Sequence, residues 1–254
     1  MDTEYYESRR NDPRSTEELI RTALTEEDED VAWEHVATLH FRGTQEVFEV
    51  AQHLCKSVNP RERILGADIL GQLGIPDRTF PDGSLAILLG MLSDEEDSDV
   101  LASAATALGH LRDERAIERL VELKNHPSED VRFGVVHGLS THENESAIHT
   151  LIELSADEDE DVRNWATFGI GSLIVNDTEE IREALFQRLN ESNSEIRGEA
   201  LVGLASRGDA RVVEYLLKEL SSGSVGILAV EAAINIADPP TLHALDCIER
   251  MVGR

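Results

Sequence analysis

Small and apolar residues recur along the chain in short blocks, and each block follows an acidic residue and a valine. Three blocks align without gaps: Asp99-Val100 leads to Ala104–Gly109, Asp130-Val131 to Val135–Leu139, and Asp161-Val162 to Ala166–Gly171. The three valines are spaced at intervals of 31 residues. Within the blocks, apolar residues recur at steps of three and four, the period of a helix with one buried face. A fixed repeat of this length indicates stacked helical units.

The same frame extends in both directions and gives seven copies. We call the first position of each block the anchor, and the anchors fall at positions 31, 62, 100, 131, 162, 196 and 225. A second apolar-periodic segment precedes most anchors, as in Ala116–Leu123, Ala147–Leu154 and Val212–Leu217. We call these preceding segments A helices and the anchored ones B helices. A single pair buries too little surface alone, so the pairs are expected to stack and share a core.

The predicted fold is therefore all-α: a right-handed α–α superhelix of about seven helix pairs. A final helix with Leu242, Leu245, Ile248 and Met251 is expected to cap the stack. Residues 1–14 are assigned to an N-terminal arm that could be mobile, and residues 15–254 to a single solenoid. The segment Gly74–Gly83 is rich in Pro and Gly and predicts a longer loop between two repeats.

The repeat resembles the HEAT family, in particular its short-repeat branch related to phycobilisome-lyase repeats. The resemblance rests on Asp-Val-Arg followed by a helix of small residues that ends in Gly, as in Asp161 to Gly171, and it covers roughly residues 16 to 252. It implies an α-solenoid. It implies no single activity, because the family includes scaffolds, inhibitors, lyases and a few oxygenases.

The charge of the chain limits its partners. With 23 Lys and Arg against 51 Asp and Glu, the formal net charge is −28. Nucleic acids and anionic membranes would be repelled, whereas basic protein segments would be attracted. Cys55 and Cys247 form no disulfide framework, and no apolar stretch approaches the length of a secretory signal or a membrane span. We therefore expect a cytoplasmic protein.

The B helices are expected to line the concave side of the superhelix. Helical periodicity exposes positions two, three, six and ten after each anchor. Both tryptophans and three of the six phenylalanines fall there, where a solvated face would carry Lys, Glu or Gln. Exposed aromatic surface favours partner binding, whereas packing by neighbouring elements is the alternative. The predicted partner-binding residues are Trp33, Phe41, His110, Phe133, His137, Trp165, Phe168 and Glu199.

Charged residues also recur around the anchors. The arginine after four anchors (Arg63, Arg132, Arg163 and Arg197) is expected to form a structural ladder at the repeat junctions with Asp99, Asp130, Asp161 and Glu195. Acidic runs occupy the turns from A to B helices. They suit helix capping and the helix dipole, and they could instead form a docking strip for basic segments.

No motif for catalysis, phosphate binding or metal binding stands out, so we predict no catalytic residue, no metal and no cofactor. The sequence favours a non-enzymatic module that binds a basic or apolar segment of a partner protein in the concave groove. The alternative is a lyase-like or chaperone-like protein that holds a small apolar ligand, such as a tetrapyrrole, in the same groove.

Overall fold

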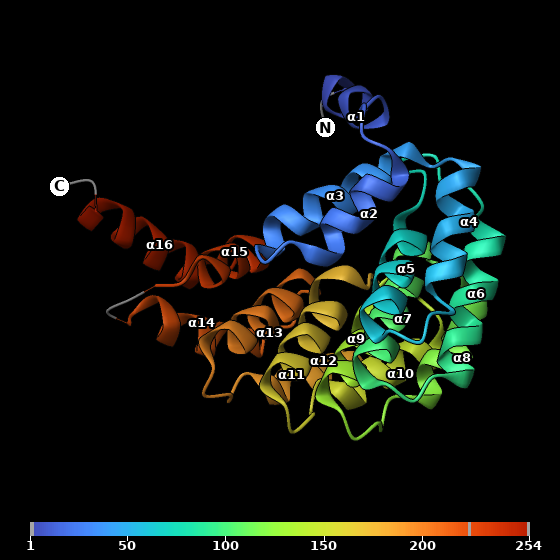
Figure 1. Ribbon diagram of the computed structural model, residues 1–254. Helices are drawn as coiled ribbons and strands as arrows, with labels where there is room; N and C mark the ends of the chain where they lie inside the picture. The colour runs from blue at the N-terminus through green and yellow to red at the C-terminus, as the bar shows by residue number, and fades with distance from the viewer. Residues whose placement is uncertain (1–2, 223–224, 253–254) are drawn as a thin grey trace. The chain divides into compact units, whose positions relative to one another are not determined.

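A computed structural model describes residues 3–222 and 225–252 of the chain (Figure 1). Every regular element in these ranges is a helix, which confirms the predicted all-α fold. The chain divides into two compact units, Met1–Gly138 and Leu139–Arg254. The predicted arm and solenoid also include residues 1, 2, 223, 224, 253 and 254, which lie outside the described residues. The single solenoid over residues 15–254 stays a prediction.

The first unit contains an N-terminal helix and four A–B pairs. Its A helices are α2, α4, α6 and α8, and its B helices are α3, α5, α7 and α9. The bounds are α1 Thr3–Arg10, α2 Thr16–Thr25, α3 Glu29–Arg42, α4 Gln45–Leu54, α5 Pro60–Gln72, α6 Pro81–Asp94, α7 Ser98–Leu111, the 3₁₀ turn η1 Glu114–Ala116, α8 Ile117–Glu122 and α9 Glu129–Leu139. The predicted loop is the connection from α5 to α6.

The second unit contains three A–B pairs and the predicted capping helix. Its A helices are α10, α12 and α14, its B helices are α11, α13 and α15, and α16 packs against α14 and α15. The bounds are α10 Glu145–Leu154, α11 Glu160–Phe168, the π-helical turn η2 Gly169–Leu173, α12 Glu179–Arg188, α13 Ser194–Ser206, α14 Val212–Leu220, α15 Ile227–Ile236 and α16 Pro239–Val252.

The burial of α7 follows the predicted register, whereas other B helices depart from it at single positions: the anchor Val31 is 43% exposed, and Leu65 and Val202 are buried at positions three and six. In α7, Val100, Ala104, Ala105, Ala107 and Leu108 are all buried, and they occupy positions zero, four, five, seven and eight. The positions expected to be accessible are the half-buried or exposed ones in the same helix, and His110 is exposed. The period of the sequence therefore sets which side of each helix faces the core.

Successive B helices approach each other through glycines. A Cβ added at Gly109 of α7 would lie 2.5 Å from the carbonyl oxygen of His137 and 2.9 Å from the Cα of Gly138 in α9. In the second unit, a Cβ added at Gly203 of α13 would lie 2.7 Å from the Cα of Gly171. Real Cβ atoms do not fit at such distances, so the close approach of these backbones requires glycine.

Asp or Asn side chains cap five of the B helices three residues before the anchor. Asp28, Asp97 and Asp159 each accept hydrogen bonds from two backbone N–H groups in the first turn of the following helix. Asn59 and Asn193 take the same position before α5 and α13. These side chains satisfy N–H groups that a helix start leaves open, so much of the acidity of the turns serves the fold.

The four arginines of the predicted ladder lie at the repeat junctions, but they do not pair with the predicted acids. Arg63, Arg163 and Arg197 donate to backbone carbonyls of the preceding turn, and Arg132 does so to the carbonyls of His126 and Pro127. Three of these arginines pair with carboxylates farther along the chain: Arg63 lies 2.6 Å from Glu95, Arg197 2.9 Å from Glu219 and Arg163 3.7 Å from Glu191.

The acid partners assigned from the sequence are therefore corrected. Asp99, Asp130, Asp161 and Glu195 are exposed residues in the first turns of B helices. From there they favour the positive end of the helix dipole. The arginine side chains instead extend back toward the turn that precedes their own helix. An acid just before the anchor does not lie in that direction.

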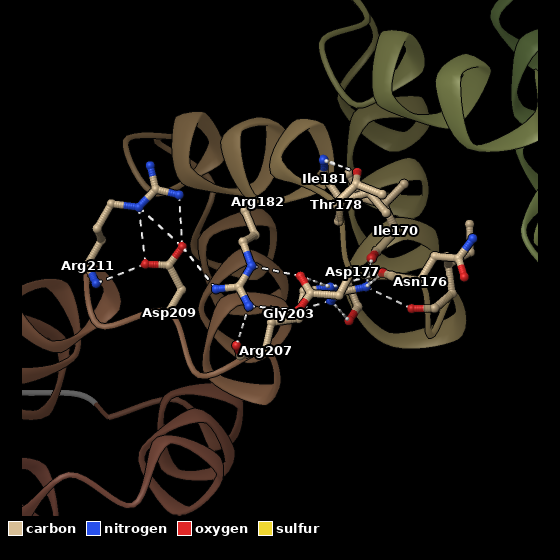
Figure 2. A network of polar contacts seen from close by, with 12 residues as sticks. Ile170, Asn176, Asp177, Thr178, Ile181, Arg182, Gly203, Arg207, Asp209 and Arg211 are labelled. Atoms are coloured by element: carbon tan, nitrogen blue, oxygen red, sulfur yellow. Dashed lines mark hydrogen bonds and ion pairs between the residues drawn. The ribbon is translucent and has the colours of Figure 1, made fainter. Parts of the chain in front are cut away.

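A second polar network joins the repeats of the second unit at the turns from B to A helices (Figure 2). Arg207, at the end of α13, is buried and donates to the carbonyls of Ile170, Gly171, Ile174 and Asn176 within 3.0 Å, and of Gly203 in its own helix. Burial lowers the pKa of the Arg207 guanidinium. The π-helical turn η2 and the segment after it leave these carbonyls open, and Arg207 satisfies them.

Carboxylates complete this network on both sides of Arg207. Arg182 contacts Asp177 at 2.7 Å, and it donates to the backbone carbonyl of Arg207. The hydrogen bond from Arg182 lowers the pKa of Asp177, and the hydrogen bond from Arg211 lowers the pKa of Asp209. The turn is thus held by charge-assisted hydrogen bonds.

Arg207→Met should destabilise the second unit by about 3 kcal/mol, because it leaves buried carbonyls without donors. Chemical denaturation followed by circular dichroism measures the loss. Lys218→Ala, which removes an exposed cation of the same unit, should change the unfolding free energy by less than about 0.5 kcal/mol. Equal effects of the two changes would contradict this role of Arg207.

Candidate functional site

Positions two, three, six and ten of the B helices form one face in each unit. In the first unit we call this surface of α3, α5, α7 and α9 the α3–α9 face. In the second unit we call the surface of α11 with η2, α13 and α15 the α11–α15 face. Together the two faces carry all eight residues that the sequence predicts for partner binding.

An exposed aromatic pair marks the α11–α15 face. Trp165 and Phe168 lie one turn apart on α11, with ring centroids 5.7 Å apart and planes nearly perpendicular. Trp165 is 40% exposed and Phe168 is half-buried. The edge-to-face contact holds the two rings against each other, so they present a fixed apolar surface to solvent.

A partly desolvated carboxylate lies on the neighbouring helix of the same face. Glu199 of α13 accepts a hydrogen bond of 3.3 Å from Ser172 of η2. Burial raises the pKa of Glu199, and the negative charges of Glu195 and Glu231 raise it further. Three like charges near one another are unfavourable, and a bound cation would relieve their repulsion.

The α13 and α15 end of this face is apolar and recessed. Ile227 is 82% exposed at the start of α15. A cavity of about 830 Å³ lies beside it and is lined by Gly198, Ile227 and Leu228, by Glu195, and by the ion pair of Arg197 and Glu219. A Cβ added at Gly198 would lie 2.6 Å from Leu228, so glycine allows this leucine to lie against α13. The recess combines apolar walls with carboxylates.

The α3–α9 face begins with Trp33, which is 46% exposed. Its ring meets His40 edge-on, with centroids 5.8 Å apart. His40 is buried, and burial lowers its pKa to about 4. Its Nε2 lies 2.9 Å from the Asp68 carbonyl oxygen. A carbonyl only accepts, so the neutral ring donates from Nε2.

Phe41 is not accessible on this face, contrary to the exposure predicted at position ten. It is 5% exposed because Tyr5 and Tyr6 of α1 cover it, with ring centroids at 5.7 and 5.0 Å. The repeat pattern could not indicate this contact, since α1 lies outside the repeats.

A half-buried carboxylate that the sequence analysis passed over lies on α5 in the α3–α9 face. Asp68 of α5 accepts a hydrogen bond of 2.8 Å from the hydroxyl of Ser103 on α7. Burial raises the pKa of Asp68 to about 6. Asp68 stands at position six, where most other copies carry uncharged residues. This departure from the repeat is the one feature of the sequence that could have drawn attention to Asp68.

The remaining predicted residues of the first unit lie toward α7 and α9. Phe133 and His137 lie one turn apart on α9, with ring centroids 4.7 Å apart and planes tilted by 52°. His110 lies exposed at the end of α7, close enough to His137 for their charges to interact. Desolvation lowers the pKa of both histidines. Trp33 is separate from this group, because α5 and α7 lie between α3 and α9 in the stack.

The sequence analysis also missed a repeated Asp-x-Arg triplet, which lies before α2 and at two turns from B to A helices. In Asp12–Arg14, Asp113–Arg115 and Asp209–Arg211, the carboxylate accepts from both the backbone and the guanidinium of the arginine. Arg115 then reaches back to Asp82, and Arg211 to Glu183. These two triplets join successive A helices, whereas the Arg14 guanidinium lies 2.7 Å from Nδ1 of His35 in α3.

Comparison with known proteins identifies the repeat. The model of HEAT repeats matches residues 85–171 and 154–237. The chain belongs to the HEAT-repeat family. Among curated proteins it is 32% identical to YibA of Escherichia coli strain K12 over 214 residues, which is 82% of this chain and 76% of YibA.

Solved structures agree with this assignment. The X-ray structure of E. coli YibA has a TM-score of 0.75 and 29% identity, and the match covers 98% of this chain and 91% of YibA. The complex of CpcE and CpcF of phycocyanin lyase from Nostoc sp. PCC7120 has a TM-score of 0.52 and 16% identity, covering 94% and 96%. The Cnd3–Cnd2 subcomplex of condensin from S. pombe has a TM-score of 0.59 and 19% identity, covering 85% and 32%. At these identities the lyase and condensin likenesses show the fold alone.

In the part of the chain that the structure describes, no three His, Cys, Asp or Glu side chains group to hold a metal ion. Within the same ranges, no helix combines the length and the apolar character needed to cross a bilayer.

Asp68→Asn should stabilise the first unit at pH 8 by about 1–2 kcal/mol, because it removes an ionised carboxylate from a desolvated site. Asp68 has a pKa of about 6 in the fold against 3.8 ordinarily. The wild-type chain therefore gains stability from this group as the pH falls from above 6 to below 4. The advantage of the variant should shrink over the same range.

Thermal melts from pH 4 to pH 8 measure this difference. Asp94→Asn, at the exposed end of α6, is the matched control and should follow the wild-type profile. A constant difference between Asp68→Asn and wild type at every pH would contradict the assigned titration.

Proposed function

We propose that this HEAT-repeat chain is a non-enzymatic module that binds a partner protein through its B-helix faces. The partner segment would carry arginine or lysine next to apolar side chains. The observation that carries the proposal is the exposure of both tryptophans on these faces, with carboxylates on the same surfaces.

Exposure of the aromatic rings favours recognition over packing. A tryptophan that only filled the core would lie between the helix layers, whereas Trp33 and Trp165 are 46% and 40% exposed. Large rings held in place by neighbours lose little entropy on binding, and such residues dominate binding energies at protein interfaces. The perpendicular Trp165–Phe168 pair is already fixed in the free chain.

The charge around the pair selects the partner. A guanidinium or ammonium group over Trp165 would gain a cation–π contact. From there it could also approach Glu199, whose charge is partly desolvated and repelled by Glu195 and Glu231. The chain as a whole carries a net charge of −28, which would speed encounter with a basic protein.

The similar structures support a binding role at the level of the fold. The condensin and phycocyanin lyase structures are complexes of named subunits. The stacked helix pairs of the family form long surfaces that suit extended protein partners. The Trp165 pair and Glu199 would adapt this surface to a basic and apolar segment.

Trp165→Ala with Phe168→Ala should abolish capture of the partner from extracts of the source organism, because it removes the apolar anchor of the α11–α15 face. We expect at least a hundredfold loss of affinity, equivalent to roughly 2.7 kcal/mol. Affinity capture with quantitative mass spectrometry identifies the partner, and titration of the purified partner measures the loss.

The matched control is a second aromatic pair on the A helices. Phe186 of α12 and Tyr215 of α14 also meet edge-to-face, with centroids 5.9 Å apart. Changing both to Ala removes a similar ring pair from another surface, so the partner should still bind. Circular dichroism checks that both double variants stay helical. Retention of the partner by the Trp165 and Phe168 variant would reject the proposed face.

A charge variant separates the polar part of the recognition. Glu199→Gln keeps the acceptor for Ser172 but removes the charge, so it should weaken a basic partner about tenfold without unfolding the chain. Unchanged affinity would show that the partner is bound through apolar contacts only.

A further inference from the structure

The N-terminal helix α1 lies on the α3–α9 face of its own chain. It is eight residues long and belongs to no A–B pair. It packs against α3, and its contacts fall on Glu34, Thr38 and Phe41. Two of these, Glu34 and Phe41, occupy the positions three and ten that the periodicity assigns to partner binding. Helix α1 thus covers part of the α3–α9 face of its own chain.

The contacts of α1 combine aromatic and basic groups. Tyr5 and Tyr6 pack on Phe41 with centroids at 5.7 and 5.0 Å. One turn later, Arg9 donates to the Glu34 carbonyl at 2.9 Å and to Thr38 at 3.0 Å, and it also pairs with the Glu34 carboxylate. The Arg9 guanidinium lies 5.1 Å from the centroid of the Tyr5 ring.

The second arginine extends the same mode of contact. Arg10 donates to the Phe41 carbonyl at 3.3 Å and lies 3.4 Å from Asp77 of the α5–α6 loop. Both arginines of α1 therefore meet acidic side chains, and both tyrosines meet the one buried phenylalanine of the face. The surface of α3 is therefore complementary to α1 in charge and in apolar character.

We expect the attachment of α1 to be weak. An isolated helix of eight residues is not stable in water, so docking on α3 must supply its order. Apart from the contact of Arg10 with Asp77, the docked surface is one face of α3, and Tyr5 remains 40% exposed. The Arg10–Asp77 pair is exposed and adds little, whereas Arg9 is only 19% exposed in its pair with Glu34. A competing segment of the same chemistry could replace α1.

We propose that the surface of α3 beneath α1, formed by Glu34, Thr38 and Phe41 beside Trp33, binds a helical partner segment with an aromatic pair followed one turn later by arginines. In the free chain α1 occupies this surface and competes with the partner. The inference rests on the proposed function, since it assigns the α3–α9 face to the same binding role. It adds the sequence chemistry of the segment and an intramolecular competitor.

The test uses a fluorescein-labelled synthetic peptide of residues 1–12 as the probe and fluorescence anisotropy as the readout. In the wild-type chain the tethered α1 acts at an effective concentration of roughly millimolar, so the peptide should bind weakly. Arg9→Glu with Arg10→Glu in the full chain places acids against Glu34 and Asp77 and should release α1. The peptide should then bind at least tenfold more tightly.

Two further variants keep this result specific. Arg21→Glu with Arg61→Glu makes the same change in net charge at exposed positions of α2 and α5 and should bind the peptide as weakly as wild type. Adding Glu34→Arg to the released chain should lower peptide affinity at least tenfold.

Equal peptide binding by the wild-type, released and control chains, with all three folded by circular dichroism, would overturn the proposal and leave α1 as a fixed part of the fold. An unchanged affinity after Glu34→Arg would overturn it as well. These results do not depend on Trp165 or Phe168. Failure of the proposed function in the capture experiment and failure of this inference are therefore distinguishable.

Discussion

The close approach of successive B helices is the contact on which the rest of the structure depends. At Gly109 and Gly203 there is no room for a Cβ, because the neighbouring backbone lies within 3 Å of where it would stand. Packing this tight fixes the rotation of α7 against α9 and of η2 against α13. In α7 the same rotation that buries positions zero, four, five, seven and eight leaves positions two, three, six and ten half-buried or exposed. Core and binding faces thus follow from one constraint.

Polar groups hold this arrangement at both ends of the helices. At the turns from A to B helices, Asp and Asn caps satisfy backbone N–H groups, and the arginines after the anchors satisfy carbonyls. At the opposite turns, Arg207 and the Asp-x-Arg triplets do the same. Many of the acids in this acidic chain therefore have structural partners. Glu199 and Asp68 differ, because each is a desolvated carboxylate on a B-helix face with a raised pKa.

The fold could be predicted from the sequence because the residues that pack in the core recur at the period of the repeat. The spacing of Val100, Val131 and Val162 predicted the B helices, their buried side and the accessible positions of both tryptophans. The acid partners of the arginines were wrong, since sequence proximity does not reveal in which direction a long side chain extends. The burial of Phe41 could not be predicted either. It depends on α1, which shares no pattern with the repeats and reaches α3 only through the folded chain.

The central claim is that the B-helix faces are the surfaces that partners cover. The chain has two tryptophans, Trp33 and Trp165, one on each face, so intrinsic fluorescence reports on these surfaces directly. Acrylamide quenching of single-tryptophan chains, made with Trp33→Phe or Trp165→Phe, should be strong in the free protein. In the stoichiometric complex with the captured partner, quenching of Trp165 should fall several-fold. Quenching that stays the same in that complex would contradict the account.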